Sequence, residues 1–262
     1  MSKKYFVLIG ISILLQLIGI MAPFIGVGRD VINITNIPLS NLASLILLMI
    51  GLKGLYKDTK NQDFYNGSIL AVVGICVIFA GTLVSPMFAG GTFIGPFKYV
   101  YKIIENQNDD NLILILTSQF LKSFRALFIV IALGVIFYAI SLLKFVKGLI
   151  SQNIFENHKK RIKKSIRTFA ILNVILIVLS IITMTFFIKM VDIIILSNRN
   201  MTEDMAFEWL GYLFLAYFGS LLAIAPAVFY YINIIKSVVF VFKTPSNFIN
   251  VENETIKINN EI

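Results

Sequence analysis

Residues 158–188 read HKKRIKKSIR followed by TFAILNVILIVLSIITMTFFI, so a basic segment leads directly into a long run without charge. An α-helix rises about 1.5 Å per residue, and roughly 20 apolar residues therefore cross the hydrocarbon core of a bilayer. Lys and Arg are retained on the cytoplasmic side of a membrane. This stretch predicts a membrane-spanning helix over 168–188 that starts at the cytoplasmic face.

The rest of the chain has the composition of a membrane protein. Of its 262 residues, 58% are hydrophobic and only 14% are charged. A soluble domain of this length needs a charged exterior, because much of its surface stays in water. The runs long enough to span a bilayer are 5–24, 37–55, 67–88, 126–143, 168–188 and 209–235. We therefore expect an all-α fold, a polytopic bundle of about six transmembrane helices.

The distribution of positive charge predicts the orientation of these spans. The net charge is +9, and most of the 23 Lys and Arg residues share one side of the membrane if the N-terminus is inside. Six spans with both termini in the cytoplasm fit this bias. The first span is too long for a signal peptide and lacks an Ala-x-Ala cleavage site. We expect a multi-pass protein of the cell membrane, with a transmembrane domain over 1–243 and a mobile, polar cytoplasmic tail over 244–262.

Residues 112–121 are apolar but precede two cations, Lys122 and Arg125. A helix that joined them to the fourth span would be longer than the hydrocarbon core is thick. We expect a segment on the outer membrane surface that turns or bends into the fourth span, with both cations reaching lipid headgroups. A long, tilted fourth helix is the alternative.

Two cytoplasmic connections share a local pattern. Phe64 and Asn66 follow the second span at the same offsets at which Phe155 and Asn157 follow the fourth. The pattern predicts two related helical hairpins, or else a chance match, since repeats are established only by sustained similarity.

One part of the chain resembles a known family. The segment Gly51-Leu-Lys-Gly-Leu-Tyr-Lys-Asp58 is followed by Phe64-Tyr-Asn-Gly-Ser-Ile-Leu70 and a glycine-containing helix. Over roughly residues 1–90 the chain resembles the archaeal multi-pass membrane family known as domain of unknown function 996. That family's loop proline is replaced here by Thr59-Lys60-Asn61. The resemblance implies a membrane architecture and an archaeal source, and it implies no catalytic residue because the family has no established activity.

Small residues line one face of each of two predicted spans. Membrane helices associate through such faces, because small side chains let the backbones approach closely. We interpret them as packing surfaces inside the bundle and, alternatively, as an interface with a partner protein or another copy of the chain. The helix-packing residues are Gly67, Gly74 and Gly81 in the third span and Gly219, Ala223 and Ala227 in the sixth.

The predicted spans contain no Asp, Glu, His or Arg, which argues against a proton relay or an ion site in the membrane core. Gln16 and Asn173 are expected to make hydrogen bonds between helices. Alternatively, they line a solute path with Pro226, which should kink the last span. Tyr230 and Tyr231 are interpreted as anchors at the inner interface.

The densest charge lies in the second basic loop. Such a cluster beside a membrane attracts anionic lipid headgroups, although it can also act only as a topology determinant. No aromatic interleaving or nucleic-acid-binding motif accompanies it, so we expect no nucleic acid partner. The predicted headgroup residues are Lys159, Lys160, Arg161, Lys163, Lys164 and Arg167.

Signatures of catalysis and of metal binding are missing from the sequence. His158 is the single histidine and Cys76 the single cysteine, so we expect no catalytic residue, no metal and no cofactor. Asn33 and Asn200 are candidate glycosylation sites in predicted outer loops.

The leading hypothesis is a non-catalytic accessory or scaffold subunit that packs with other membrane proteins or lipids. The alternative is a channel or facilitator for a small neutral solute. An enzyme is the least favoured class.

Overall fold

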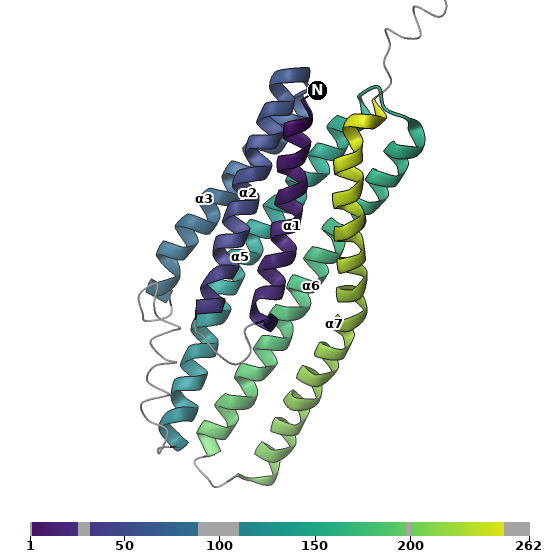
Figure 1. Cartoon of the computed structure of the whole chain (residues 1–262). Helices are drawn as coiled ribbons and strands as arrows, with labels where there is room; N and C mark the ends of the chain where they lie inside the picture. Colours follow the sequence, from purple (N-terminus) through teal and green to yellow (C-terminus); the bar gives the residue numbers. More distant parts are fainter. Residues whose placement is uncertain (1, 26–31, 89–109, 198–200, 249–262) are drawn as a thin grey trace, which may run out of the picture.

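A computed structural model describes residues 2–25, 32–88, 110–197 and 201–248 (Figure 1). Among them the chain forms only helices and one isolated bridge between Ile154 and Phe248, which confirms the all-α prediction. The elements are α1 (Lys3–Ile25), α2 (Ile32–Thr59), α3 (Gln62–Phe88), α5 (Asp110–Ile150), α6 (Glu156–Ser197), α7 (Glu203–Lys243) and the 3-10 turn η1 (Thr244–Asn247).

The described helices have the length and composition of membrane helices. Each α-helix contains one of the predicted spans. Four stretches of described residues are long and apolar enough to cross a membrane by themselves: Gln62–Gly81, Phe128–Ile150, Glu156–Ser197 and Glu203–Asn247. These stretches indicate a membrane protein, whereas the number of spans and their orientation stay predictions.

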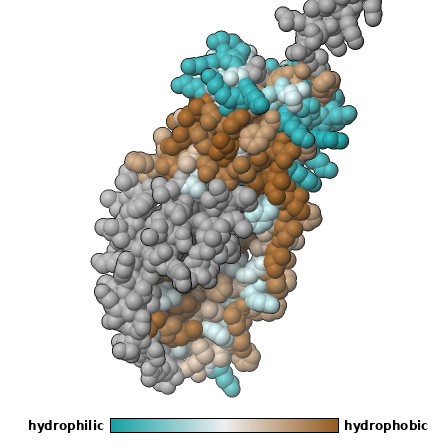
Figure 2. Space-filling view, in the orientation of Figure 1, coloured by the Kyte–Doolittle hydropathy of each residue, from teal (hydrophilic) through white to brown (hydrophobic). Residues whose placement is uncertain are grey.

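The helices form a closed bundle. Each packs against the next one in chain order, and α1 also packs against α7 (Figure 1). Hydrophilic residues gather at the end of the bundle that holds the N-terminus, and a largely hydrophobic surface lies beyond them (Figure 2). This separation places the polar end of the molecule where the sequence predicts the cytoplasmic face.

An aromatic centre joins the first helix to the last described residue, Phe248. The ring of Phe6 lies 6.3 Å from that of Phe145 and 6.0 Å from that of Phe248, and Phe64 lies 6.2 Å from Phe145. Phe6, Phe64 and Phe145 are fully buried. Because these rings come from α1, α3, α5 and the segment after η1, burying them ties the hydrophilic end of the bundle together.

The helix that contains the predicted fourth span is longer than the sequence analysis favoured. Helix α5 runs without interruption over Asp110–Ile150, so the expected turn after residue 121 is wrong. The position of residues 112–121 relative to the membrane stays a prediction. The stretch contains no proline. The ammonium of Lys122 lies 2.8 Å from the carboxylate of Asp192 on α6. This ion pair links the N-terminal part of α5 to the C-terminal part of α6.

The predicted tail begins later than expected. Thr244 is fully buried, and Pro245 fits the start of η1, where no backbone donor is needed. The Asn247 carbonyl accepts a hydrogen bond from the Phe155 amide at 3.2 Å, and the ring of Phe248 packs on Phe6. Residues 244–248 therefore belong to the folded body, and 249–262 lie outside the described residues.

The two connections with the shared Phe-x-Asn pattern differ in their packing. Phe64 is fully buried, whereas Phe155 is 54% exposed. Helices α2 and α5 end at equivalent positions of the pattern, Thr59 and Ile150. A common origin of the two hairpins stays a prediction.

The glycine face of α3 is covered within the chain. A Cβ atom at Gly74 would lie 3.0 Å from Cβ of Phe137 and 3.2 Å from the Leu45 side chain. One at Gly67 would lie 3.3 Å from the carbonyl oxygen of Ser141, and one at Gly81 would meet Val130. Helix α3 is thus seated on α5 and α2 through its small residues.

Gly134 of α5 completes this seam, because its Cα faces the buried side chain of Ile78 on α3. We expect Gly134→Leu to lower stability by about 1–3 kcal/mol, the usual cost of overpacking. Gly211→Leu is the matched control, since nothing lies within 4 Å of a Cβ there. The measurement is the fraction of protein that elutes as a folded peak in detergent after heating. Equal melting of the two variants would contradict a tight α3/α5 seam.

Candidate functional site

Buried polar side chains from five helices gather inside the bundle, and we call them the polar cluster. They come from α1, α2, α5, α6 and α7, and each is at most 6% exposed. The polar cluster consists of Ser12, Gln16, Asn41, Ser44, Tyr138, Asn173 and Tyr230.

Hydrogen bonds satisfy the part of the polar cluster that lies between α1, α2 and α5. The Ser12 hydroxyl donates to the Ile9 carbonyl at 2.7 Å and lies 3.3 Å from the Tyr138 hydroxyl. The Gln16 amide donates to the Ser44 hydroxyl, which in turn donates to the Asn41 carbonyl at 2.8 Å. These bonds link three helices at positions where lipid would offer no partner.

The part of the polar cluster on α6 and α7 is not satisfied. The Asn173 amide nitrogen and the Tyr230 hydroxyl are buried and have no hydrogen-bond partner among the described residues. The ring of Tyr230 packs 5.2 Å from that of Phe169, one helical turn before Asn173. Tyr230 also belongs to the same cluster of buried residues as Tyr138. The two groups without partners, on Asn173 and Tyr230, thus lie beside the hydrogen-bonded part of the polar cluster.

A buried donor without a partner costs about 1–3 kcal/mol. Such groups are available to form hydrogen bonds with water or another small molecule. The polar cluster contains amides and hydroxyls and no charged group. It can therefore donate to and accept from a neutral molecule, whereas it offers no countercharge for an ion.

The residues predicted for a solute path are distributed as follows. Gln16 and Asn173 are buried in the polar cluster at 2% and 3% exposure. Pro226 lies within α7, four residues before Tyr230 and hence on the same helix face. The structure brings Gln16 and Asn173 into one interior and places Pro226 at its edge.

The sequence analysis missed the tyrosines of the polar cluster. It assigned Tyr230 to the membrane interface, but this side chain is fully buried and packs on Phe169. Tyr138 was not singled out. Adjacent tyrosines such as Tyr230 and Tyr231 give the same hydropathy signal, and only the rotation of α7 decides which of them points inward.

The sequence analysis also did not predict the role of two acidic residues that join helices. Asp192 accepts hydrogen bonds from Ser118 at 2.6 Å and from Lys122 at 2.8 Å, so it links α6 to α5. Asp63 on α3 lies 3.3 Å from the ammonium of Lys147 and 3.8 Å from that of Lys144. Both acids lie near helix ends, outside the predicted spans.

The small residues of α7 differ in their surroundings. Gly219 is buried, and a Cβ atom there would lie 2.7 Å from the Thr183 hydroxyl of α6. Ala223 and Ala227 are half-buried. Gly219 therefore lies in the contact between α6 and α7, inside the bundle.

The basic cluster forms one face at the start of α6. Lys160, Arg161, Lys163, Lys164 and Arg167 are exposed and Lys159 is partly exposed, while the intervening Ile162, Ser165 and Ile166 are buried. The cations therefore point away from the bundle, where headgroups would meet them.

His158 does not belong to this charged face. It is 8% exposed, and its Nε2 lies 3.0 Å from the Thr244 hydroxyl oxygen, before the predicted span 168–188. Burial lowers its pKa below the ordinary value, the Arg161 and Lys243 cations lower it further, and a hydrogen bond with the Phe240 carbonyl opposes them. At neutral pH His158 is a neutral residue that attaches η1 to α6.

Other predicted sites fall partly outside the described residues. Asn33 lies in the first turn of α2 and not in a loop, and Asn200 lies outside the described residues. Among the described side chains, no three of the His, Cys, Asp or Glu type come together as a metal site.

Comparison with known proteins identifies no similar protein. No protein family model, curated protein or solved structure matches the chain. The resemblance to the archaeal membrane family therefore stays an expectation.

The position of His158 gives a pH prediction. The unfolded chain takes up a proton near the ordinary histidine pKa of about 6.5, whereas the folded chain takes it up only at lower pH. Stability is therefore complete above that value and falls as the pH drops below it. We expect the melting temperature in detergent to fall between about pH 7.5 and pH 5.5, and His158→Gln to reduce this fall.

His158 is the only histidine of the chain, so the comparison isolates one titrating group of this type. An identical pH dependence in the variant and the natural chain would show that His158 protonates freely while the protein is folded.

Proposed function

We propose that this protein is a multi-pass membrane protein with six spans and both termini in the cytoplasm, which binds and passes a small neutral solute at its polar cluster. Three buried polar groups have no hydrogen-bond partner among the described residues: the Asn173 amide, the Tyr230 hydroxyl and the indole nitrogen of Trp209. The observation that carries the proposal is that the first two belong to the polar cluster, whereas Trp209 lies near the start of α7.

The chemistry of the polar cluster supports a solute that is both a donor and an acceptor of hydrogen bonds. Its members are amides and hydroxyls, and Ser12, Gln16 and Ser44 already hold one another. Water and small polyols or amides have the required groups. A charged solute would be disfavoured, because an ion taken from water into this interior would meet no opposite charge.

A second buried polar contact supports access from the cytoplasmic end. The hydroxyls of Ser165 on α6 and Ser237 on α7 lie 2.9 Å apart, and Ser165 also donates to the Asn233 carbonyl at 3.2 Å. Ser237 lies two helical turns from Tyr230 along α7. Polar groups thus continue along the α6/α7 contact from the polar cluster toward the hydrophilic end of the bundle.

The accessory or scaffold subunit is the second candidate function. The glycine face of α3 no longer supports it, because α2 and α5 occupy that face. The support that remains is the side of α7 turned away from α6, where Phe214, Tyr217 and Phe229 are 63%, 64% and 60% exposed. Lipid or a partner helix would cover these rings.

Reconstitution in liposomes tests the proposed function. The swelling and shrinking of proteoliposomes in gradients of water, glycerol and urea reports the permeability to each solute. We expect Tyr230→Phe to lower the permeability about 3- to 10-fold, which corresponds to the loss of one hydrogen bond between the hydroxyl and the solute. Tyr231→Phe is the matched control, because it removes a hydroxyl from the neighbouring, half-exposed residue.

Asn173→Leu should lower the permeability as Tyr230→Phe does. Both variants should elute in detergent at the same volume as the natural protein, which shows that they are folded. Proteoliposomes no more permeable than empty liposomes would exclude the facilitator. A stoichiometric protein partner in mild detergent would then favour the accessory subunit.

Cysteine labelling tests the proposed orientation. In a Cys76→Ala background, we expect a membrane-impermeant maleimide applied to intact cells to label Met201→Cys and not Ser246→Cys. Both positions are exposed, and they lie at opposite ends of α7. Labelling of Ser246→Cys in intact cells would overturn the cytoplasmic assignment of the C-terminal end.

A further inference from the structure

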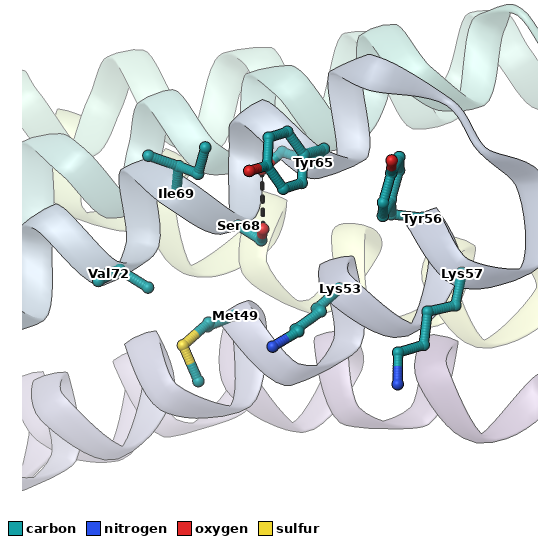
Figure 3. A pocket seen from close by; sticks show the side chains of 8 residues that line it. All are labelled: Met49, Lys53, Tyr56, Lys57, Tyr65, Ser68, Ile69 and Val72. Atoms are coloured by element: carbon teal, nitrogen blue, oxygen red, sulfur yellow. Dashed lines mark hydrogen bonds between the residues drawn. The ribbon is translucent and has the colours of Figure 1, made fainter.

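A groove lies between α2 and α3 beside the Lys60-Asn61 connection (Figure 3). Its volume is about 270 Å³. No residue of the polar cluster lines it, so it is distinct from the proposed solute site. The lining residues are Met49, Lys53, Tyr56, Lys57, Tyr65, Ser68, Ile69 and Val72.

One wall of the groove carries two cations. Lys53 and Lys57 lie one turn apart on α2, and both are exposed. Neither makes an ion pair among the described residues, in contrast to Lys122, Lys144 and Lys147. Two like charges at this spacing repel each other, so an anion between them would stabilise both.

The rest of the groove is apolar. Met49 on α2 and Ile69 and Val72 on α3 form the walls beyond the lysines, and Ile69 and Val72 are 43% and 41% exposed. At the other end, the rings of Tyr56 and Tyr65 lie 5.0 Å apart (Figure 3). The tyrosines therefore close the groove near the connection, while its apolar end runs toward the middle of the helices.

The dimensions match an amphiphile. Lys57 and Met49 are separated by eight residues, which corresponds to about 12 Å along the helix axis. This length accommodates one phosphate group and the first methylene groups of an acyl chain.

We propose that the α2/α3 groove binds an anionic phospholipid, with the phosphate between Lys53 and Lys57 and one acyl chain along Ile69 and Val72. Charge complementarity selects the anion, and the exposed apolar wall selects a lipid over a soluble phosphate. The proposal does not depend on the solute function, because the groove and the polar cluster share no residue.

Native mass spectrometry of the full-length protein, exchanged into detergent with phosphatidylglycerol or phosphatidylcholine, tests the site. We expect retention of phosphatidylglycerol and little of phosphatidylcholine. The double variant Lys53→Gln/Lys57→Gln should bind phosphatidylglycerol about 30-fold more weakly, at about 1 kcal/mol per lysine. The control Lys236→Gln/Lys243→Gln removes the same charge from two exposed positions of α7 and should keep the lipid.

Two further experiments distinguish a bound phospholipid from a bound soluble phosphate compound. Val72→Trp fills the apolar end without changing charge, and it should also lower retention of phosphatidylglycerol. Glycerol phosphate, which has the anion and no acyl chain, should not displace the lipid.

Displacement by glycerol phosphate would overturn the lipid assignment in favour of a free phosphate. Equal loss of lipid in the two double variants would show diffuse attraction to basic residues and would overturn the site. Unchanged binding in Lys53→Gln/Lys57→Gln would also overturn it.

Discussion

Polar groups buried in a lipid-embedded bundle have to be satisfied within the protein, because hydrocarbon offers no hydrogen-bond partner. The backbone meets this requirement by being helical in nearly all described residues. The side chains meet it through bonds between helices, such as Gln16 with Ser44 and Ser165 with Ser237. Asn173, Tyr230 and Trp209 do not meet it, and the first two identify the candidate site because they belong to the polar cluster.

The closed arrangement of the helices creates this interior. Small residues allow α3 to approach α5, and the contact of α1 with α7 brings the first and last helices together. Ion pairs at the helix ends, Asp192 with Lys122 and Asp63 with Lys147, add links where water can still reach them. Packing therefore holds the middle of the bundle and charge holds its ends, which leaves the polar cluster enclosed but uncharged.

The two proposed sites use the membrane differently. The polar cluster lies inside the bundle and offers neutral hydrogen bonds, whereas the α2/α3 groove opens on the outside and offers two cations above an apolar wall. A bound lipid at the groove would touch α2, the helix that supplies Asn41 and Ser44 to the polar cluster. The two sites are thus neighbours in the fold without sharing a side chain.

The sequence by itself determined the helical class, because long apolar runs are visible without any knowledge of contacts, and every predicted span falls within a helix. It also identified Gln16 and Asn173, since a polar residue stands out in an apolar run. It failed for residues 112–121, where the partner that fixes Lys122 is Asp192, distant in sequence. Only the tertiary structure decided that Tyr230 points inward and that Lys53 and Lys57 flank a groove. Helix rotation and neighbouring side chains settle such questions, and hydropathy along one chain carries no record of either.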